Sequence, residues 1–243
     1  MRTKSGRIPK RTRLSILSGR QSATNTHGGD FQTKPEVAIL DVDMGNLWSL
    51  KQALIREGAH AVFAKAPDDL ASADKIILPG VGAFGVAIDR LKGSGLADAL
   101  KARIAEGAHL LGICLGMQLL AEVSEEGGDH QGLSLIPGRV TRLESKINTE
   151  RIPHAGWNNV QQSATSSLFQ NIPDERDFYF VHSYRFVPED PSNILATTPY
   201  CGEFVSAIKS KRVTGVQFHP EKSQRDGLQL LKNFIHSSDP IEC

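Results

Sequence analysis

Short apolar runs alternate with segments of helical periodicity through the first half of the chain, and this alternation constrains the fold more than any other feature. The apolar runs span residues 37–42, 61–64, 75–80 and 109–114, and the helical segments span 46–58, 95–107 and 115–123. Strands joined through helices imply right-handed crossovers, which produce a mostly parallel sheet with helices on both faces. We therefore predict an α/β domain built on such a central sheet.

The second half of the chain carries a different pattern. Strand-like runs joined by short turns span residues 133–143, 178–187, 193–198, 204–209 and 213–218, and a helical segment spans 224–236. These runs predict antiparallel strands that extend the sheet, followed by a closing helix. The expected architecture is one domain over residues 35–243 with a β-rich second half.

Charge is distributed unevenly along the chain. Residues 1–34 hold eight Lys or Arg residues and one acid, Asp30, whereas the whole chain has 28 basic and 27 acidic residues. Residues 35–243 therefore carry 20 basic and 26 acidic groups, a net charge of −6. A negatively charged body binds phosphate backbones poorly, so nucleic-acid binding is not expected. The sequence has no run of about 18 apolar residues, so no membrane span is expected.

Residues 1–34 form a leader that is rich in Arg, Ser and Thr. It lacks the apolar stretch of about 7 to 15 residues that a secretory signal needs, and it fits a disordered basic tail, an over-extended start or an organellar transit peptide. Cys114, Cys201 and Cys243 form no C-x-x-C pair, which argues against a disulfide framework or a zinc site. We expect a cytoplasmic protein with no metal or other cofactor, or one in an organellar stroma or matrix if the leader is a transit peptide.

The strongest local signal is Gly112-Ile113-Cys114-Leu115-Gly116, which places a cysteine between two glycines after an apolar run and before a helical segment. This is the cysteine form of the nucleophile elbow, a sharp strand-to-helix turn that leaves no room for side chains beside the nucleophile. The helix N-terminus favours a thiolate, and the N–H of Leu115 can stabilise an oxyanion. The alternative interpretation is that Cys114 is a small buried core residue, and the two flanking glycines argue against it.

A base and an orienting acid for this thiol are offered by His219-Pro220-Glu221, which follows the strand-like run at 213–218. In an extended segment, residues at i and i+2 project to the same side, so Glu221 can hold the imidazole of His219. Such a pair stabilises imidazolium beside a thiolate. Taken alone, the tripeptide could be an ordinary surface turn. Together with the candidate nucleophile Cys114, it completes a candidate Cys-His-Glu triad.

Residues 79–85, PGVGAFG, also match the G-x-G-x-x-G pattern after a strand. A dinucleotide site would need an acid about 20 residues further on, at the end of the next strand. The nearest acid there, Asp98, lies in a helical segment, and the strand before the loop is the third of the domain. The alternative function of the loop is to offer the N–H of Gly80 or Val81 as part of an oxyanion hole beside Cys114.

Taken together, these motifs resemble class I glutamine amidotransferases, and more narrowly the glutaminase subunits of imidazole glycerol phosphate synthases in histidine biosynthesis. The resemblance covers about residues 36–236 and includes GICLGMQ (112–118), FHPEK (218–222), PGVGAF (79–84) and similar segments at 43–46, 153–158 and 179–184. PGVGAF is the most discriminating segment, because most other class I members have a P-G-G loop there. The resemblance implies a flavodoxin-like amidotransferase fold.

The resemblance implies a specific chemistry. Cys114, activated by His219 beside Glu221, would hydrolyse glutamine to glutamate and ammonia through a thioester. The oxyanion hole would consist of backbone amides from Leu115 and from Gly80 or Val81. The substrate-binding residues carried over from the family are Gln118, Glu126, Ser183 and Tyr184.

The resemblance also implies a partner, a separate (β/α)8-barrel cyclase that receives the ammonia and makes imidazole glycerol phosphate and an aminoimidazole-carboxamide ribotide. Asn46, Trp157 and Tyr179 match family positions at or near the interface of this heterodimer; by themselves, the two aromatic residues would be assigned to the core. Asp43-Met44 departs from the common family pattern, so a paralogue that feeds another synthase, such as one for surface polysaccharide, stays open. A cysteine hydrolase of the same fold and a dinucleotide-binding module are further alternatives.

Overall fold

The computed structural model describes residues 34–43, 45, 47–145 and 150–237, so the expected leader lies outside the described residues except for Lys34. The first half contains β1 (Glu36–Leu40), α1 (Leu47–Arg56), β2 (His60–Ala64), β3 (Lys75–Gly80), α2 (Phe84–Gly93), α3 (Leu96–Ala105), β4 (His109–Cys114) and α4 (Leu115–Gln118). The second half contains β5 (Val123–Ser124), β6 (His130–Gln131), β7 (Gly138–Arg142), β8 (His154–Gln162), β9 (Arg176–His182), β10 (Tyr184–Pro188), β11 (Ile194–Thr198), β12 (Phe204–Ser210), β13 (Val213–Val216) and α5 (Gln224–His236). Short 3-10 turns occur at η1 (Pro67–Leu70), η2 (Ser167–Phe169), η3 (Pro191–Asn193) and η4 (Pro220–Lys222).

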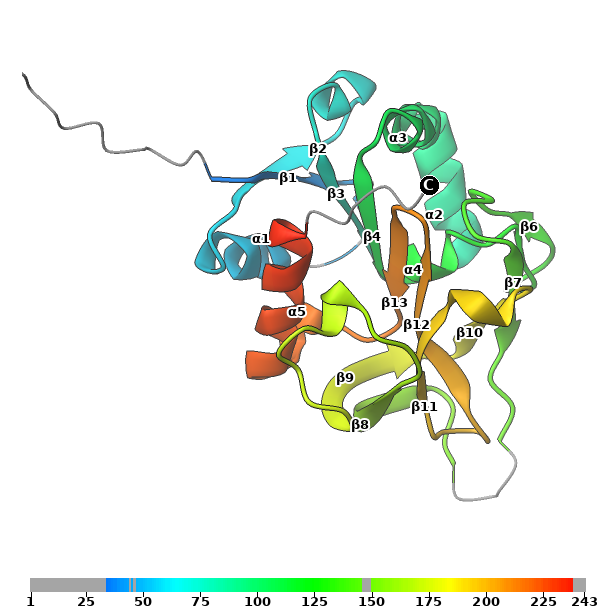
Figure 1. The fold of residues 1–243 in the computed structure, drawn as a ribbon. Coiled ribbons are helices and arrows are strands. Elements are labelled where there is room, and N and C mark those ends of the chain that lie inside the picture. The colour runs from blue at the N-terminus through cyan, green and yellow to red at the C-terminus, as the bar shows by residue number, and fades with distance from the viewer. Residues whose placement is uncertain (1–33, 44, 46, 146–149, 238–243) are drawn as a thin grey trace, which may run out of the picture. The chain divides into compact units, whose positions relative to one another are not determined.

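A nine-stranded sheet runs through the described residues in the order β2-β1-β3-β4-β13-β12-β11-β8-β9 (Figure 1). The first five strands in this order are mutually parallel. From β12 onward every pairing is antiparallel. The predicted combination of parallel strands and an antiparallel extension is confirmed, although parallel and antiparallel pairings are equally frequent among the described strands of this sheet. Two expectations were wrong: the run at 213–218 forms β13, which is parallel to β4, and the run at 133–143 supplies β7 to a second sheet. The two kinds of pairing meet at β13.

Helices cover both faces of the parallel part of the sheet, with α1 and α5 on one face and α2 and α3 on the other (Figure 1). Because side chains alternate along a strand, each strand supplies both cores. On β1, Val37 and Ile39 pack with α1 and α5, whereas Ala38 and Leu40 pack with α2 and α3. The continuous apolar run of β1 is explained by burial on both faces.

A second, smaller sheet has the order β10-β7-β5-β6, and its strand β10 contacts α4, the helix that follows β4. None of the described helices is long and apolar enough to cross a membrane. The closing helix α5 has the bounds predicted from the sequence, and its buried residues recur at helical spacing.

The helix expected over residues 115–123 was wrong in its length, since α4 ends at Gln118. The carbonyls of residues 119–122 accept hydrogen bonds from the N–H groups of residues 132–136 instead of continuing the helix. A Cβ at Gly132 would lie 2.2 Å from the carbonyl oxygen of Ala121, so only glycine permits this close approach. A contact distant in sequence thus overrides the local helical periodicity.

Besides the short 3-10 turns, four elements were not predicted from the sequence: the helix α2, the strand β8 and the two-residue strands β5 and β6. The helix begins at Phe84, within the glycine-rich segment 79–85 that was interpreted as a loop. The strand β8 contains Gly156 and two asparagines, which are poor strand formers and masked its pattern. The run at 178–187 is also divided at Ser183 into β9 and β10, which belong to different sheets.

Candidate active site

Cys114 stands at the junction of β4 and α4 in a strained backbone conformation. Its φ is 55° and its ψ is −111°, a combination that residues other than glycine rarely adopt. A Cβ at Gly112 would lie 2.7 Å from the carbonyl oxygen of Gly116, and a Cβ at Gly116 would lie 1.7 Å from that of Leu78. Both glycines are therefore required by close backbone contacts, as the elbow pattern predicts.

The neighbours of β4 bring two further loops to this junction. On one side β13 is parallel to β4 with Val216 opposite Ile113, so the chain leaving β13 passes beside Cys114. On the other side β3 places Gly80 opposite Cys114. The three motifs found in the sequence thus meet at the carboxyl ends of adjacent parallel strands, where α/β sheets bind their ligands (Figure 1).

The side chains of His219 and Glu221 form a buried pair. Nδ1 of His219 lies 2.8 Å from Oε1 of Glu221, and the two side chains are 4% and 8% exposed. The expected extended geometry was wrong, because residues 220–222 form the 3-10 turn η4. The turn is held by Ser223, whose Oγ donates to the carbonyl of His219 at 2.6 Å and accepts from the N–H of Tyr179 at 3.0 Å.

The second ring nitrogen of His219, Nε2, is buried and makes no hydrogen bond within the described residues. Burial lowers the pKa of His219, but the thiol of Cys114 and the carboxylate of Glu221 outweigh this effect and raise the pKa to about 9. The imidazole is therefore protonated at neutral pH. A cationic ring next to a cysteine sulfur favours the thiolate.

A pocket of about 300 Å³ opens beside Cys114. It is lined by Val81, Gly82, Cys114, Leu115, Gln118, Glu126, Pro153, Val181, His182, Ser183 and Tyr184. Seven of the residues selected from the sequence are among these. Gly80, His219 and Glu221 instead line a neighbouring cavity of about 30 Å³, which shares Val81 with the pocket. The structure therefore brings together all the described residues selected for the nucleophile, base, oxyanion hole and substrate.

Gln118 and Tyr184 are joined within the pocket wall. Nε2 of Gln118 donates to the carbonyl of Tyr184 at 2.9 Å and to Oε1 of Gln217 at 3.1 Å. Gln217 in turn donates from Nε2 to the sulfur of Cys114 at 3.8 Å. The carbonyl of Tyr184 is thus already occupied by protein donors, which leaves other groups of the wall to meet a ligand.

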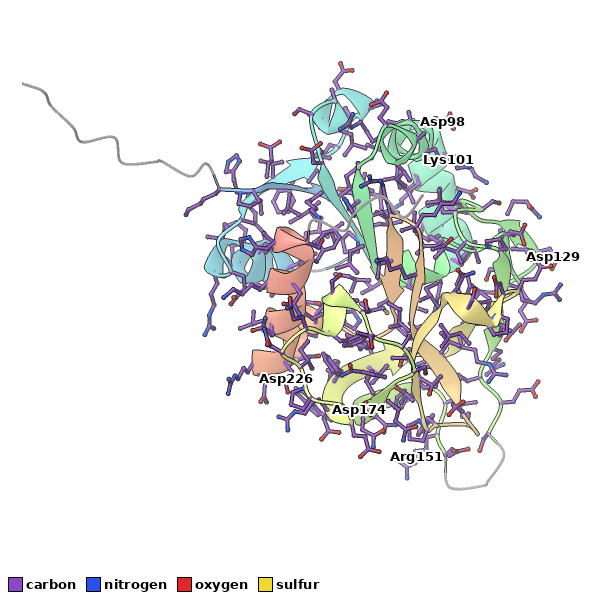
Figure 2. All side chains as sticks on the ribbon, viewed as in Figure 1. Asp98, Lys101, Asp129, Arg151, Asp174 and Asp226 are labelled. Carbon is purple, nitrogen blue, oxygen red and sulfur yellow. The ribbon has the colours of Figure 1, made fainter. Side chains whose placement is uncertain are left out.

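Glu126 connects the glycine-rich loop to the pocket. Its Oε2 accepts a hydrogen bond from the N–H of Phe84 at 2.9 Å, at the first turn of α2. This bond fixes the end of the loop that carries Val81, while Gly82, with φ 100°, supplies a backbone conformation that suits glycine. Asp98, the acid that a dinucleotide site would need, lies exposed in the first turn of α3 (Figure 2).

Trp157 and Tyr179 are a cross-strand pair on β8 and β9 and do not line the pocket. Their rings are 6.1 Å apart in an edge-on arrangement, and Nζ of Lys222 lies 5.6 Å from the centre of the Tyr179 ring. Trp157 is 48% exposed, so it is not a core residue. Asn46, the third residue selected at this surface, lies outside the described residues.

The glutamine amidotransferase class-I family matches residues 38–237 of the chain. The chain belongs to this family. Among curated amidotransferases of this kind, the "imidazole glycerol phosphate synthase subunit HisH" of Chlorobaculum tepidum is 46% identical over 82% of this chain and 98% of its own length. The protein of the same name from Moorella thermoacetica is 48% identical over 82% of this chain and 93% of its own.

Solved structures show the same amidotransferase fold. One described as "Crystal structure of glutamine amidotransferase" has a TM-score of 0.65 at 20% identity and covers 82% of this chain and 96% of its own. PurLQS from Thermotoga maritima has a TM-score of 0.65 at 18% identity and covers 83% of this chain and 97% of its own. The predicted fold class, a class I glutamine amidotransferase fold, is confirmed.

Sequence reasoning missed two polar residues of the amidotransferase site, Gln217 and His182, both of which are buried. Each lies among apolar residues of a strand-like run, in VQF for Gln217 and in FVH for His182, and a polar residue at such a position was the available signal. No cluster of His, Cys, Asp or Glu suited to a metal ion occurs in the parts of the chain that the structure describes.

Proposed function

We propose that this chain is the glutaminase subunit of an imidazole glycerol phosphate synthase, with Cys114 as its nucleophile. The observation that carries the proposal is a cysteine held at positive φ at the end of β4, with a glutamate-paired imidazole delivered by the adjacent strand β13. The curated relatives of 46–48% identity that bear the synthase name support the choice of pathway.

In the proposed mechanism, the Cys114 thiolate attacks the carboxamide carbon of glutamine. The N–H of Leu115 and that of Gly80 or Val81 donate to the resulting oxyanion, a type of stabilisation worth about 3 to 4 kcal/mol per donor in a comparable hydrolase. His219 gives its proton to the departing ammonia, leaving a glutamyl thioester. It then accepts a proton from the water that hydrolyses the thioester, while Glu221 keeps the ring oriented.

The pocket has groups that suit the amino-acid end of glutamine. Glu126 uses one carboxylate oxygen on the loop at Phe84, so the other is available to an α-ammonium group. Ser183 and the Oε1 of Gln118 also face the ligand volume in this proposal, since the amide nitrogen of Gln118 is already engaged. The volume of about 300 Å³ is adequate for one small amino acid.

The surface around the pocket suits a partner subunit. Val81, Trp157 and Val181 are apolar residues with 40%, 48% and 37% of their surface exposed, and two of them also line the pocket. Exposed apolar groups beside a site mark an interaction surface. We assign this face to a (β/α)8-barrel cyclase that takes up the ammonia, in a cytoplasmic heterodimer whose reducing surroundings keep the nucleophile free.

The test is the Cys114→Ala variant in complex with a candidate cyclase. Synthesis from glutamine should be lost, whereas synthesis from added ammonium salt should persist, because the cyclase reaction does not use the thiol. If glutamine turnover survived the change, Cys114 would be ruled out as the nucleophile. Normal glutamine turnover by the unaltered chain without formation of imidazole glycerol phosphate would instead point to a paralogous synthase.

A further inference from the structure

The stabilisation of the Cys114 thiolate needs a source other than the helix that follows it. The macrodipole of a helix is the sum of its aligned peptide units, and α4 has only four residues. A thiolate buried to 5% exposure requires nearby donors or cations. His219 supplies a cation next to the sulfur, and Nε2 of Gln217 adds a hydrogen-bond donor at 3.8 Å.

The orientation of the Gln217 amide is fixed by a single backbone carbonyl. The oxygen of Tyr184 can only accept, so Gln118 must present its NH₂ group to it. The same NH₂ group donates to Gln217, which must therefore present its oxygen to Gln118. The remaining group of Gln217, its NH₂, is thereby directed at the sulfur of Cys114.

Two buried histidines hold the same carbonyl from the other side. Nδ1 of His182 donates to the oxygen of Tyr184 at 2.8 Å, which leaves Nε2 of His182 to accept from Nδ1 of His154 at 3.1 Å. Nε2 of His154 accepts from the side-chain amide of Asn158 at 3.3 Å. Each hydrogen bond of this network has a defined donor and acceptor, so reversing one member would place two donors or two acceptors against each other.

We propose that Gln217 stabilises the Cys114 thiolate by donating a hydrogen bond to its sulfur, and that His182, through the carbonyl of Tyr184, is a positioning residue that fixes the direction of this bond. The inference rests on the proposed role of Cys114 as the nucleophile. When the sulfur is protonated it donates instead to the carbonyl of Val181 at 3.9 Å. The site thus has a defined partner for each protonation state of the thiol.

Other titratable groups also surround the sulfur. Those that line the pocket and the neighbouring cavity are His219, Glu221 and Lys222 after β13, His182 at the end of β9, Tyr184 at the start of β10 and Glu126 after β5. Replacement of Gln217 by an uncharged residue leaves all of them in place. A change in the titration of Cys114 in such a variant therefore reports the lost donor.

The experiment measures the rate at which iodoacetamide alkylates Cys114 in the full chain as a function of pH, with the modified peptide identified by mass spectrometry. Gln217→Leu removes the donor at similar volume and should move the midpoint of the rate profile upward by about one pH unit, the size expected for a hydrogen bond to a charged group. Gln217→Glu places an oxygen at the sulfur and should move it further. Ser206→Ala removes a buried hydroxyl that has no hydrogen-bond partner among the described residues, and it should leave the midpoint unchanged.

The positioning role of His182 is tested by a conservative pair. His182→Leu removes the donor to Tyr184 and should raise the midpoint, whereas His182→Asn keeps a nitrogen near the position of Nδ1 and should restore it.

An unchanged midpoint in folded Gln217→Leu protein would overturn the role of Gln217. If that variant does not fold, an unchanged midpoint in Gln217→Glu decides the matter in the same way. These results are independent of the Cys114→Ala assay, so failure of this inference is distinguishable from failure of the proposed function.

Discussion

At the scale of single residues, the site depends on atoms that leave almost no free space. The carbonyl of Leu78 occupies the volume in which a side chain at Gly116 would lie, and this contact helps to hold Cys114 at positive φ. Such strain persists only where the surrounding structure fixes the backbone. The requirement for glycine here was visible in the sequence, whereas the atom that imposes it was not.

Gly116→Ala should reduce the free energy of unfolding by at least about 3 kcal/mol, because the added methyl would overlap a backbone oxygen that cannot move away. Urea denaturation is the measurement. Gly93→Ala is the matched control, since Gly93 ends α2 with open space around it and should be neutral or stabilising. Equal stability of the two variants would contradict the packing argument.

Glu221→Gln should lower kcat for glutamine by about 100-fold or more with a smaller effect on KM, because the neutral amide no longer favours imidazolium and no longer fixes the tautomer of His219. Steady-state kinetics of the assembled complex measure both constants. The closely related change Glu122→Gln, at an exposed residue just before β5 that does not line the pocket or the neighbouring cavity, is the control for removal of one acidic group. A fall in KM alone would argue against the role of Glu221.

At the scale of elements, the site is assembled from the loops after β3, β4 and β13, and the sequence predicted these three strands and their motifs. The bounds of β3 and β4 were predictable because buried parallel strands leave continuous apolar runs. The third strand, β13, was predicted two residues too long and as antiparallel, because its parallel pairing with β4 depends on a neighbour about 100 residues away in sequence. The links between loops were not predictable, because they depend on contacts distant in sequence. Examples are the carbonyls after α4 that bind residues 132–136, and Ser223, which ties η4 to β9.

Ser223→Ala should lower the free energy of unfolding by about 1 to 3 kcal/mol, because it leaves the N–H of Tyr179 and the carbonyl of His219 without their buried partner. Since this serine anchors the turn that carries His219, kcat should fall with little change in KM. Ser192→Ala, in an exposed 3-10 turn, should change neither quantity. Wild-type kcat in a destabilised Ser223→Ala protein would show that the turn does not need this anchor.

At the scale of the whole molecule, buried histidines act in opposite directions on stability. Burial lowers the pKa of His182 to about 3 and that of His154 to about 4, so both are neutral in the folded chain. In the unfolded chain these two histidines have a pKa of about 6.5, so below that pH they bind protons that the folded chain does not bind. Their contribution to stability is therefore lost as the pH falls below about 6.5. His219, whose pKa is raised to about 9, stabilises the fold below pH 6.5 and loses this contribution as the pH rises through 9.

We therefore expect the histidine contribution to stability to be greatest near pH 6.5. Between pH 6.5 and 4.5 the part due to His182 should cost about 2 to 3 kcal/mol. Chemical denaturation across this pH range measures it, and His182→Asn should have a shallower acid slope than the unaltered chain. His219→Asn should show a shallower loss between pH 6.5 and 9. Parallel curves for all three proteins would contradict these assignments.

The place of β13 in the central sheet has a consequence for biosynthesis. This strand fits between β4 and β12 although it is the last of the described strands, about 100 residues after Cys114. A ribosome releases the thiol long before it releases His219, so a nascent or truncated chain carries a nucleophile with no base beside it. Only insertion of the final strand completes the triad, and glutamine-directed labelling of Cys114 would then report that synthesis and folding have both finished.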